Sequence, residues 1–380
     1  MAQMRLASFP RLVQSSISLG LQGVATFALA LTLLLSAAPA AATQFREVLA
    51  DTVRETDPTP SPDGKWLAFT MAKSGTLTDI WVMPIGGGDA RRITDEPDSA
   101  RAMTPTWAPD SKSLLYISTR DRQYGVYKIP LEGGEAKRMS HGPGNHRFAS
   151  HSPDGSQIVF ASNRLDSGSL YGYNLYLMSP DGESSGKVAR QITDMGGSPG
   201  HPTWSPDGKW ISFVSKDVDT TKVVSVGTGM TSKKTAIFAM FRVFKVSVDG
   251  GKPIQLSGLR PSEEKDEDVW PTWSPDGKWI AVAKRANMKN DVWLVDAEGK
   301  RPAVKVTTAG NCSKPTWSPD GKEIWYTVMD KGSEDIWVAS DITIPPPPAP
   351  APARKAPKFK TVPATKGAAT TKPAPPKTKP

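Results

Sequence analysis

The chain has 380 residues, of which 38% are hydrophobic and 22% charged, so most of it can bury a core and a wholly disordered protein is excluded. The formal net charge is +9, but residues 1–42 contribute +2 and residues 345–380 contribute +8. Residues 43–344 therefore carry −1, which excludes a basic nucleic-acid-binding domain there. The single cysteine, Cys312, excludes an intramolecular disulfide and a multi-cysteine metal site.

The N-terminal segment, residues 1–42, has the pattern of a secretory signal peptide. Arg5 and Arg11 precede an apolar run, Val24–Leu35, which is followed by the small residues Ser36–Ala42. Cleavage is predicted near Ala40 or Ala42, and the mature protein is expected in the periplasm or outside the cell. The alternative is an uncleaved membrane anchor, because the uncharged stretch is long enough to span a bilayer.

One pattern recurs six times in the middle of the chain, with spacings of 47, 44, 53, 69 and 44 residues between copies. The copies, with consensus Thr-Trp-Ser-Pro-Asp-Gly, are Thr59–Gly64, Thr106–Ser111, Ser150–Gly155, Thr203–Gly208, Thr272–Gly277 and Thr316–Gly321. A period of about 40 to 50 residues is typical of propeller blades.

Each copy is followed by further strand signals. In the first, the apolar segments Lys65–Thr70 and Asp79–Met83 are separated by a short polar turn, and Gly86–Gly88 precedes a third segment, Ala90–Thr94. The last copy ends at Ala339 without this closing segment, whereas Gln44–Leu49 stands alone before the first copy. The prediction is an all-β, six-bladed β-propeller over residues 43–344, in which the N-terminal strand closes the last blade.

The repeated Trp-Ser-Pro-Asp-Gly-Lys-Trp, as in Trp204–Trp210 and Trp273–Trp279, followed by Asp-Ile-Trp, as in Asp79–Trp81, resembles the β-propeller repeat of the TolB family. The resemblance covers roughly residues 44–344 and implies a TolB-type propeller without the N-terminal α/β domain of that family. It further implies an exported, periplasmic protein.

The C-terminal segment, residues 345–380, is rich in Pro, Ala and Lys and is predicted to be disordered, because it has too little apolar surface to fold. Two interpretations remain open for it. It is a solvated tail, or it attaches the protein to an anionic cell-wall polymer or membrane surface.

No catalytic residue, cofactor or metal ion is predicted. Gly196–Gly200 satisfies the Gly-x-Ser-x-Gly pattern of a nucleophile elbow, but it precedes a predicted strand, whereas the elbow requires a strand before it and a helix after it. The Asp of each Pro-Asp-Gly turn is interpreted as a turn former.

All four histidines, His141, His146, His151 and His201, lie between the end of the second blade and the start of the fourth. Imidazoles from adjacent blades can converge on one metal ion. The alternative function is therefore a metal-dependent polysaccharide lyase or hydrolase, since propeller lyases that act on oligogalacturonate resemble this repeat and use a histidine-rich metal site. Against it, His151 occupies a position that is Trp in four other copies.

One position holds a different residue in every copy. It lies five residues before the Pro of each Pro-Asp pair, as Asp57 does before Pro62. Its occupants are Asp57, Thr104, Phe148, His201, Trp270 and Lys314. At the start of each innermost strand, such a position can confer ligand specificity without disturbing the repeat. These six residues, with His141 and His146, are the predicted ligand- or partner-binding residues; the alternative is that they only cap six loops.

The same face of the predicted ring receives the blade 4 insertion, around Asp217–Met240, and the acidic loop Ser262–Asp268. An apolar insertion beside an acidic loop is typical of a protein-docking surface. The predicted function is therefore a non-catalytic protein-interaction scaffold in the cell envelope, with an envelope protein as its partner and no nucleic acid. A sensor domain that binds a small ligand at the mouth of the ring is a further alternative.

Overall fold

The computed structural model describes residues 43–49, 53–165, 172–184, 187–216, 224–225, 235–236, 240–259, 266–286, 288–330 and 332–342. The predicted signal peptide, the C-terminal tail, most of the blade 4 insertion and most of the acidic loop lie outside these residues. The described residues form strands, turns and loops but no helix, so none of them belongs to a helix that could cross a membrane.

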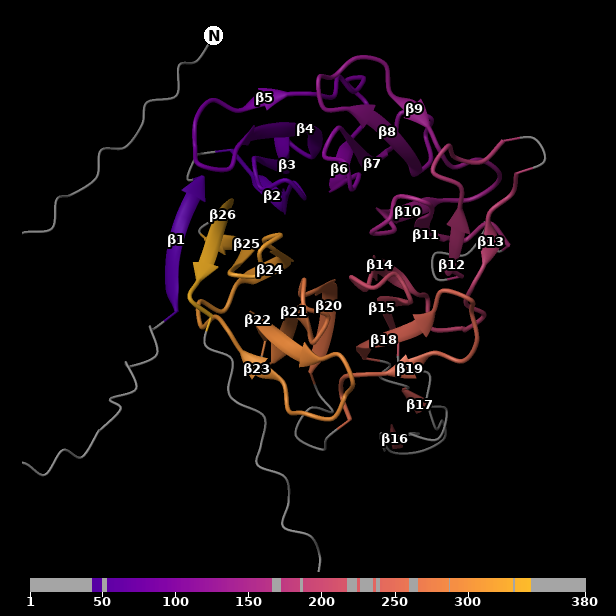
Figure 1. Ribbon diagram of the computed structural model, residues 1–380, viewed down its shortest axis with the longest axis vertical. Coiled ribbons are helices and arrows are strands. Elements are labelled where there is room, and N and C mark those ends of the chain that lie inside the picture. The colour runs from indigo at the N-terminus through magenta and orange to yellow at the C-terminus, as the bar shows by residue number, and fades with distance from the viewer. Residues whose placement is uncertain are drawn as a thin grey trace, which may run out of the picture. The chain divides into compact units, whose positions relative to one another are not determined.

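The strands form six four-stranded antiparallel sheets around a central axis (Figure 1), which confirms the predicted six-bladed β-propeller. One strand of each sheet lies nearest the axis and contacts the innermost strands of its neighbours. The innermost strands are β2 (Glu55–Pro60), β6 (Ala102–Trp107), β10 (His146–His151), β14 (Gly200–Trp204), β20 (Glu267–Trp273) and β24 (Cys312–Trp317).

The remaining strands follow outward in chain order within each blade. The second strands are β3 (Trp66–Ser74), β7 (Ser113–Ser118), β11 (Ile158–Ser162), β15 (Trp210–Lys216), β21 (Trp279–Ala286) and β25 (Glu323–Asp330). The third strands are β4 (Leu77–Pro84), β8 (Gly125–Pro130), β12 (Asn174–Met178), β18 (Phe241–Ser247), β22 (Lys289–Asp296) and β26 (Ser333–Ser340). Five outermost strands are short: β5 (Arg91–Arg92), β9 (Lys137–Arg138), β13 (Arg190–Gln191), β19 (Ile254–Gln255) and β23 (Val304–Lys305). In the blade 4 insertion, β16 (Val224–Ser225) and β17 (Thr235–Ala236) form a separate two-stranded sheet.

The outermost strand of blade 6 is β1 (Gln44–Leu49), which pairs antiparallel with β26. Val48 and Leu49 pack with Trp325 and Ile336 of blade 6 and with Phe69 of blade 1. The predicted closure by the N-terminal strand is therefore confirmed, and it covers an edge of β26 that would otherwise be unpaired.

The core is divided into six hydrophobic clusters, each shared by two neighbouring blades. Between blades 1 and 2, for example, Ile80 and Val82 of β4 pack with Leu114 and Tyr116 of β7, all at 0% exposure. Each second and third strand is covered on both faces, which explains their nearly continuous apolar sequences. Stability is therefore distributed around the ring.

The Ser-Pro-Asp-Gly segments form the tight turns between the first and second strands. In five blades the Ser hydroxyl donates to an Asp Oδ1 at 2.6 to 2.7 Å. The glycines of these turns have φ between 69° and 73°, a region in which a side chain is strained. The interpretation of the Asp residues as turn formers is confirmed.

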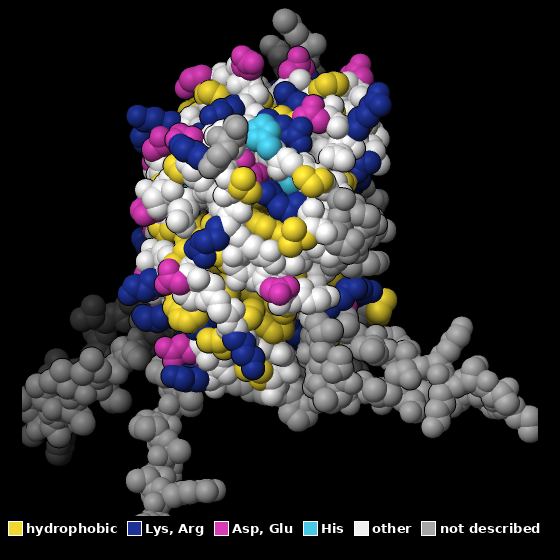
Figure 2. Space-filling view, turned by 90° about the vertical axis from the view of Figure 1, so that its right-hand side faces the viewer, with side chains coloured by type: hydrophobic (Ala, Val, Ile, Leu, Met, Phe, Trp, Pro, Cys, Tyr) yellow, Lys and Arg dark blue, Asp and Glu magenta, His cyan; other side chains and the backbone are white. Residues whose placement is uncertain are grey.

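The ring has two faces, defined by the two ends of the innermost strands. The turn face carries the Ser-Pro-Asp-Gly turns, and the mouth face carries the starts of the innermost strands and the connections between second and third strands. Gln44 pairs with Ser340, and Ser340 pairs with Glu323, the first residue of β25, which follows the Ser-Pro-Asp-Gly turn of blade 6. The N-terminal and C-terminal ends of the described chain therefore both lie at the turn face. Around the outside, the side of the ring that carries β12 and β13 shows intermixed basic and acidic side chains (Figure 2).

Candidate functional site

The six variable residues share an unusual backbone conformation. Each innermost strand has a register shift against its second strand, and the variable residue is the first of the two residues in that bulge. All six have positive φ, between 51° and 58°: Asp57, Thr104, Phe148, His201, Trp270 and Lys314. In five blades a proline follows, which is compatible with a bulge because the bulged residue is not paired in the ladder.

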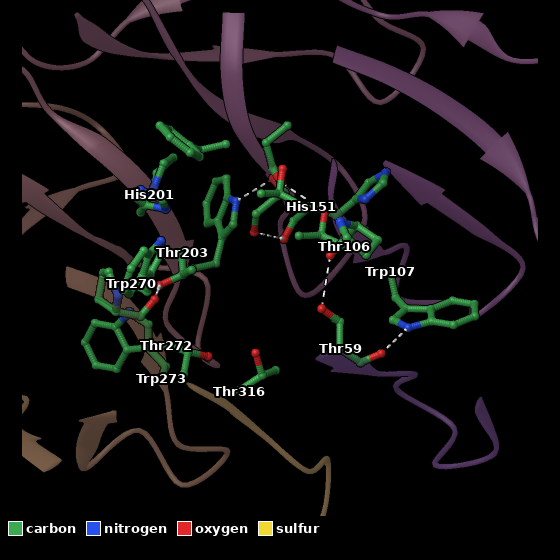
Figure 3. A pocket seen from close by; sticks show the side chains of 18 of the residues that line it. Thr59, Thr106, Trp107, His151, His201, Thr203, Trp270, Thr272, Trp273 and Thr316 are labelled. Carbon is green, nitrogen blue, oxygen red and sulfur yellow. Dashed lines mark hydrogen bonds between the residues drawn. The ribbon is translucent and has the colours of Figure 1, made fainter. Parts of the chain in front are cut away.

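All six variable residues line one central pocket of about 530 Å³. Figure 3 shows this pocket, with His201 and Trp270 labelled among the residues around it. The pocket begins at the variable residues on the mouth face and continues along the axis past a layer of Thr and Trp residues. Its size is within the range of small-molecule sites and also admits part of a partner chain. Six positions predicted from the sequence alone thus lie together, because the repeat places each at the same height in its blade.

Beneath the variable residues, Thr and Trp side chains hold the innermost strands together. In three blades the Thr hydroxyl donates to a carbonyl oxygen of another innermost strand: Thr59 to Pro105 at 3.1 Å, Thr106 to Ala149 at 2.9 Å and Thr203 to Pro271 at 3.2 Å. The indole of Trp107 donates to the carbonyl of Thr59 at 2.8 Å (Figure 3). The pocket wall is therefore supported by bonds between blades.

Blades 3, 4 and 5 contribute aromatic rings to the mouth of the pocket. His201 stacks on Phe148, with ring centroids 3.7 Å apart, and meets Trp270 edge-on at 5.9 Å. The pKa of His201 is lowered to about 3, mainly by burial. The positive charges of Lys314 and Arg147 act in the same direction, and the negative charge of Asp57 opposes them. His201 is therefore a neutral aromatic ring at neutral pH.

Blades 6 and 1 contribute an ion pair to the opposite side of the mouth. Lys314 Nζ lies 2.9 Å from Asp57 Oδ1 and donates a hydrogen bond to Thr56 Oγ1 at 2.6 Å. The Asp57 side chain is only 9% exposed, so the pair is shielded from water and its geometry is fixed. The two charges compensate each other within the pocket.

Two polar groups near the mouth have no hydrogen-bond partner among the described residues. Thr104 Oγ1 is buried and unpaired, and Thr104 is a β-branched residue at φ 51°, a combination that is strained. Arg147 Nε is also buried and unpaired, and its guanidinium lies 3.6 Å from the centroid of Tyr124. Arg147 was not among the binding residues predicted from the sequence, although it directly precedes the variable residue Phe148.

The four histidines do not converge. His141 is exposed, and its backbone N–H donates to Glu183 Oε2 at 2.9 Å. His146 is fully buried in β10 with Nδ1 3.4 Å from Arg164 Nη2, and burial lowers its pKa to about 4. His151 occupies the Trp position of its blade, and burial lowers its pKa to about 4 as well.

Of the eight predicted binding residues, only the six variable ones line the pocket, and His141 and His146 do not. No group of three or more His, Cys, Asp or Glu side chains in the described part of the chain is arranged to hold a metal ion. His151 and His201 both line the central pocket, from different layers of it, whereas His141 and His146 lie outside its lining. The four histidines therefore do not form one site in the described residues.

Among the described residues of types that act as a base or a nucleophile are His201, Ser198 and Cys312. His201 has no hydrogen bond to a hydroxyl or carboxylate within the described residues, as a general base acting on a nucleophile would require. Ser198, in the Gly-x-Ser-x-Gly segment, lies in a loop that leads into β14 rather than into a helix. Cys312 is buried, and burial raises the pKa of its thiol, which reduces its reactivity.

Sequence comparison finds similarity to a protein family and to individual proteins. The model of the family described as the TolB beta propeller domain matches residues 40–171. An uncharacterized protein of Agrobacterium fabrum is 29% identical over 224 residues, which is 59% of this chain and 68% of that protein.

Comparison by structure gives the same architecture. TolB from Acinetobacter baumannii has a TM-score of 0.54 at 18% identity, covering 74% of this chain and 65% of its own. An oligogalacturonate lyase in complex with manganese has a TM-score of 0.51 at 14% identity, covering 78% of this chain and 93% of its own. At these identities the structures show a shared fold and leave activity open. The chain is therefore similar in sequence to the TolB beta propeller domain over residues 40–171, and its described residues form a six-bladed β-propeller like those structures.

Proposed function

We propose that this protein is an exported, non-catalytic interaction scaffold that holds a protein partner of the cell envelope at its mouth face. The observation that carries the proposal is the convergence of six different side chains, all at positive φ, on one pocket. Such strained backbone persists only where the surrounding structure imposes it, and it is concentrated at functional sites. A capping role alone would not require a different side chain in each blade.

The mouth combines two kinds of contact that protein interfaces use. Trp270 is half-buried, lines the pocket and offers a large aromatic surface next to the His201–Phe148 stack. Arg147, held on Tyr124, has no ion-pair partner among the described residues. Trp, Tyr and Arg are the residues most often responsible for binding energy at interfaces, so this cluster would be the energetic centre of the contact.

The positions of the chain ends are compatible with attachment to a surface. Residues 1–42 carry the signal-peptide pattern, and residues 345–380 carry +8. Thr43 and Asp341, the neighbours of these segments, are joined at the turn face by a hydrogen bond of 3.5 Å. A tail that binds an anionic cell-wall polymer or membrane would then leave the opposite, mouth face accessible.

Partner capture tests the proposal. Residues 43–380 would be immobilised and incubated with an envelope extract, and captured proteins would be quantified by mass spectrometry. Trp270→Ala and Arg147→Ala should each reduce the amount of the principal captured protein about tenfold, since each removes a central contact. Phe45→Ala is the matched control, because Phe45 is an exposed aromatic residue of β1 outside the pocket.

Two results would contradict the proposal. One is capture that both mouth variants leave unchanged, which would place the contact elsewhere on the ring. The other is equal loss in Phe45→Ala, which would indicate nonspecific adsorption to exposed aromatic residues. Circular dichroism and thermal unfolding of each variant would show that its propeller is intact.

A further inference from the structure

The mouth of the pocket is divided into two chemically different walls. Phe148, His201 and Trp270, from blades 3, 4 and 5, form what we name the aromatic wall. Lys314, Asp57 and Thr104, from blades 6, 1 and 2, form the polar wall. Because these blades follow one another around the ring, the two walls face each other across the pocket.

The six residues give the mouth no net charge. Lys314 and Asp57 compensate each other at 2.9 Å, and His201 stays neutral because burial lowers its pKa to about 3. A charged ligand entering the pocket would lose its hydration without finding an uncompensated partner among the six side chains that form the two walls. Arg147 is not among the residues that line the pocket, and its guanidinium lies on the ring of Tyr124. The side chains of the two walls therefore favour a ligand without net charge.

The polar wall nevertheless requires hydrogen bonds. Thr104 Oγ1 is buried, has no partner among the described residues and can both donate and accept. A purely apolar ligand would leave it unpaired, which costs about 1 to 3 kcal/mol for a buried polar group. The Asp57–Lys314 pair on the same wall can additionally accept and donate. The complementary ligand has several hydroxyl groups on one side and an apolar face on the other.

We propose that the mouth pocket binds a neutral saccharide unit, whose C–H face packs on the aromatic wall and whose hydroxyl groups bond to the polar wall. A pyranose ring has this division, because its axial C–H groups form a flat apolar surface and its hydroxyls donate and accept at the rim. The volume of about 530 Å³ accommodates a short oligosaccharide. The inference rests on the pocket that the proposed function uses, and it adds a ligand class beyond a protein partner.

Isothermal titration calorimetry of residues 43–380 with a trisaccharide of N-acetylglucosamine and with maltotriose tests this directly. Binding of at least one of these neutral sugars is expected, and trigalacturonate, which is acidic, should bind more weakly. Trp270→Ala should weaken binding about tenfold, because it removes the largest ring of the aromatic wall. Phe45→Ala should leave it unchanged.

Thr104→Val provides a second variant that separates binding from folding. It keeps the β-branched shape but removes the unpaired hydroxyl, so the thermal midpoint should stay the same or rise. If the hydroxyl bonds to the saccharide, affinity should fall about fivefold to tenfold in the same variant. If Thr104 had only a structural role, Thr104→Val would not lower the affinity while leaving the thermal midpoint the same or higher.

Several outcomes would overturn the inference. These are the absence of a binding heat with both neutral sugars at millimolar concentration, tighter binding of trigalacturonate, and affinity that neither Trp270→Ala nor Thr104→Val changes. If no sugar binds while partner capture depends on Trp270, the pocket is a peptide site, and the saccharide inference fails while the proposed function stands. If sugars bind and no protein is captured, the saccharide inference stands and the proposed protein-binding function fails.

Discussion

The two ends of each innermost strand differ in how their polar groups are satisfied. At the turn face, Ser274 donates to Asp276 at 2.6 Å and accepts from the backbone of Trp279 at 3.0 Å, and the same arrangement recurs with little change in other blades. At the mouth face, the side chains differ in every blade, the backbone is strained, and Thr104 has a buried hydroxyl without a described partner. The polar side chains at the turn end are thus satisfied by their own turn, whereas those at the mouth end are not all satisfied within the described residues.

This difference indicates where a repeat protein can acquire specificity. A residue whose hydrogen bonds are all internal is constrained by folding, so changing it costs stability in every blade. A residue in a bulge lines the central pocket, and its side chain differs from blade to blade. If the mouth residues bind a ligand as proposed, mutations at the two ends of the same strand should have separate effects on stability and on binding.

The largest effect is expected at the turn end. Ser274→Ala removes the hydrogen bond to the Asp276 carboxylate and the acceptor of the Trp279 N–H in one step, in a residue that is 3% exposed. We expect a loss of about 3 kcal/mol in the free energy of unfolding, measured by urea denaturation, with ligand binding at the mouth unchanged. Ser156→Ala is the control, because Ser156 also donates to a turn Asp, at 2.8 Å, but is exposed. Equal losses in the two variants would contradict this assignment.

A pH-dependent effect is expected from His151, which occupies a constant position of the repeat. Burial lowers its pKa in the folded state to about 4, against about 6.5 when unfolded, so below pH 6.5 the unfolded chain binds a proton that the folded chain excludes. The contribution of His151 to stability is therefore lost progressively as the pH falls from 6.5 to about 4.

Replacing His151 by Trp, the residue of four other blades, should reduce this acid sensitivity. Between pH 7.5 and pH 5 the wild-type protein should lose about 2 kcal/mol more unfolding free energy than His151→Trp. Urea denaturation at both pH values measures the difference. His146 and His201 remain in the variant and keep part of the sensitivity, so parallel losses in the two proteins would show that His151 does not titrate as expected.

The fold was largely predictable because its determinants are local and repeated. The Ser-Pro-Asp-Gly turns, the alternating apolar strands and the isolated Gln44–Leu49 segment identify six blades and the closing strand without knowledge of distant contacts. The positions of the six variable residues follow from the same repeat, because equivalent positions in a ring lie around one axis. The role of these residues in binding remains a prediction.

The chemistry of the site was less predictable, because it depends on which blades are neighbours and on backbone conformation. Lys314 and Asp57 are far apart in the sequence and meet only because blade 6 closes on blade 1. The four histidines are close in sequence, but only His151 and His201 line the central pocket, and His141 and His146 lie outside its lining. The positive φ of the variable residues has only one sequence signal, the proline that follows five of them.

The smallest effect is expected from relieving strain at the mouth end. Thr104 has φ 51°, where a β-branched side chain is disfavoured and Asn is tolerated. Thr104→Asn should therefore raise the free energy of unfolding by about 1 kcal/mol, seen as a rise of a few degrees in the thermal midpoint. Thr106→Asn, two residues further along β6, is the matched control: it removes the hydroxyl bond to the Ala149 carbonyl, so the midpoint should fall. A fall in both variants would mean that the mouth end is as constrained as the turn end, and that the variable residues are part of the structural framework after all.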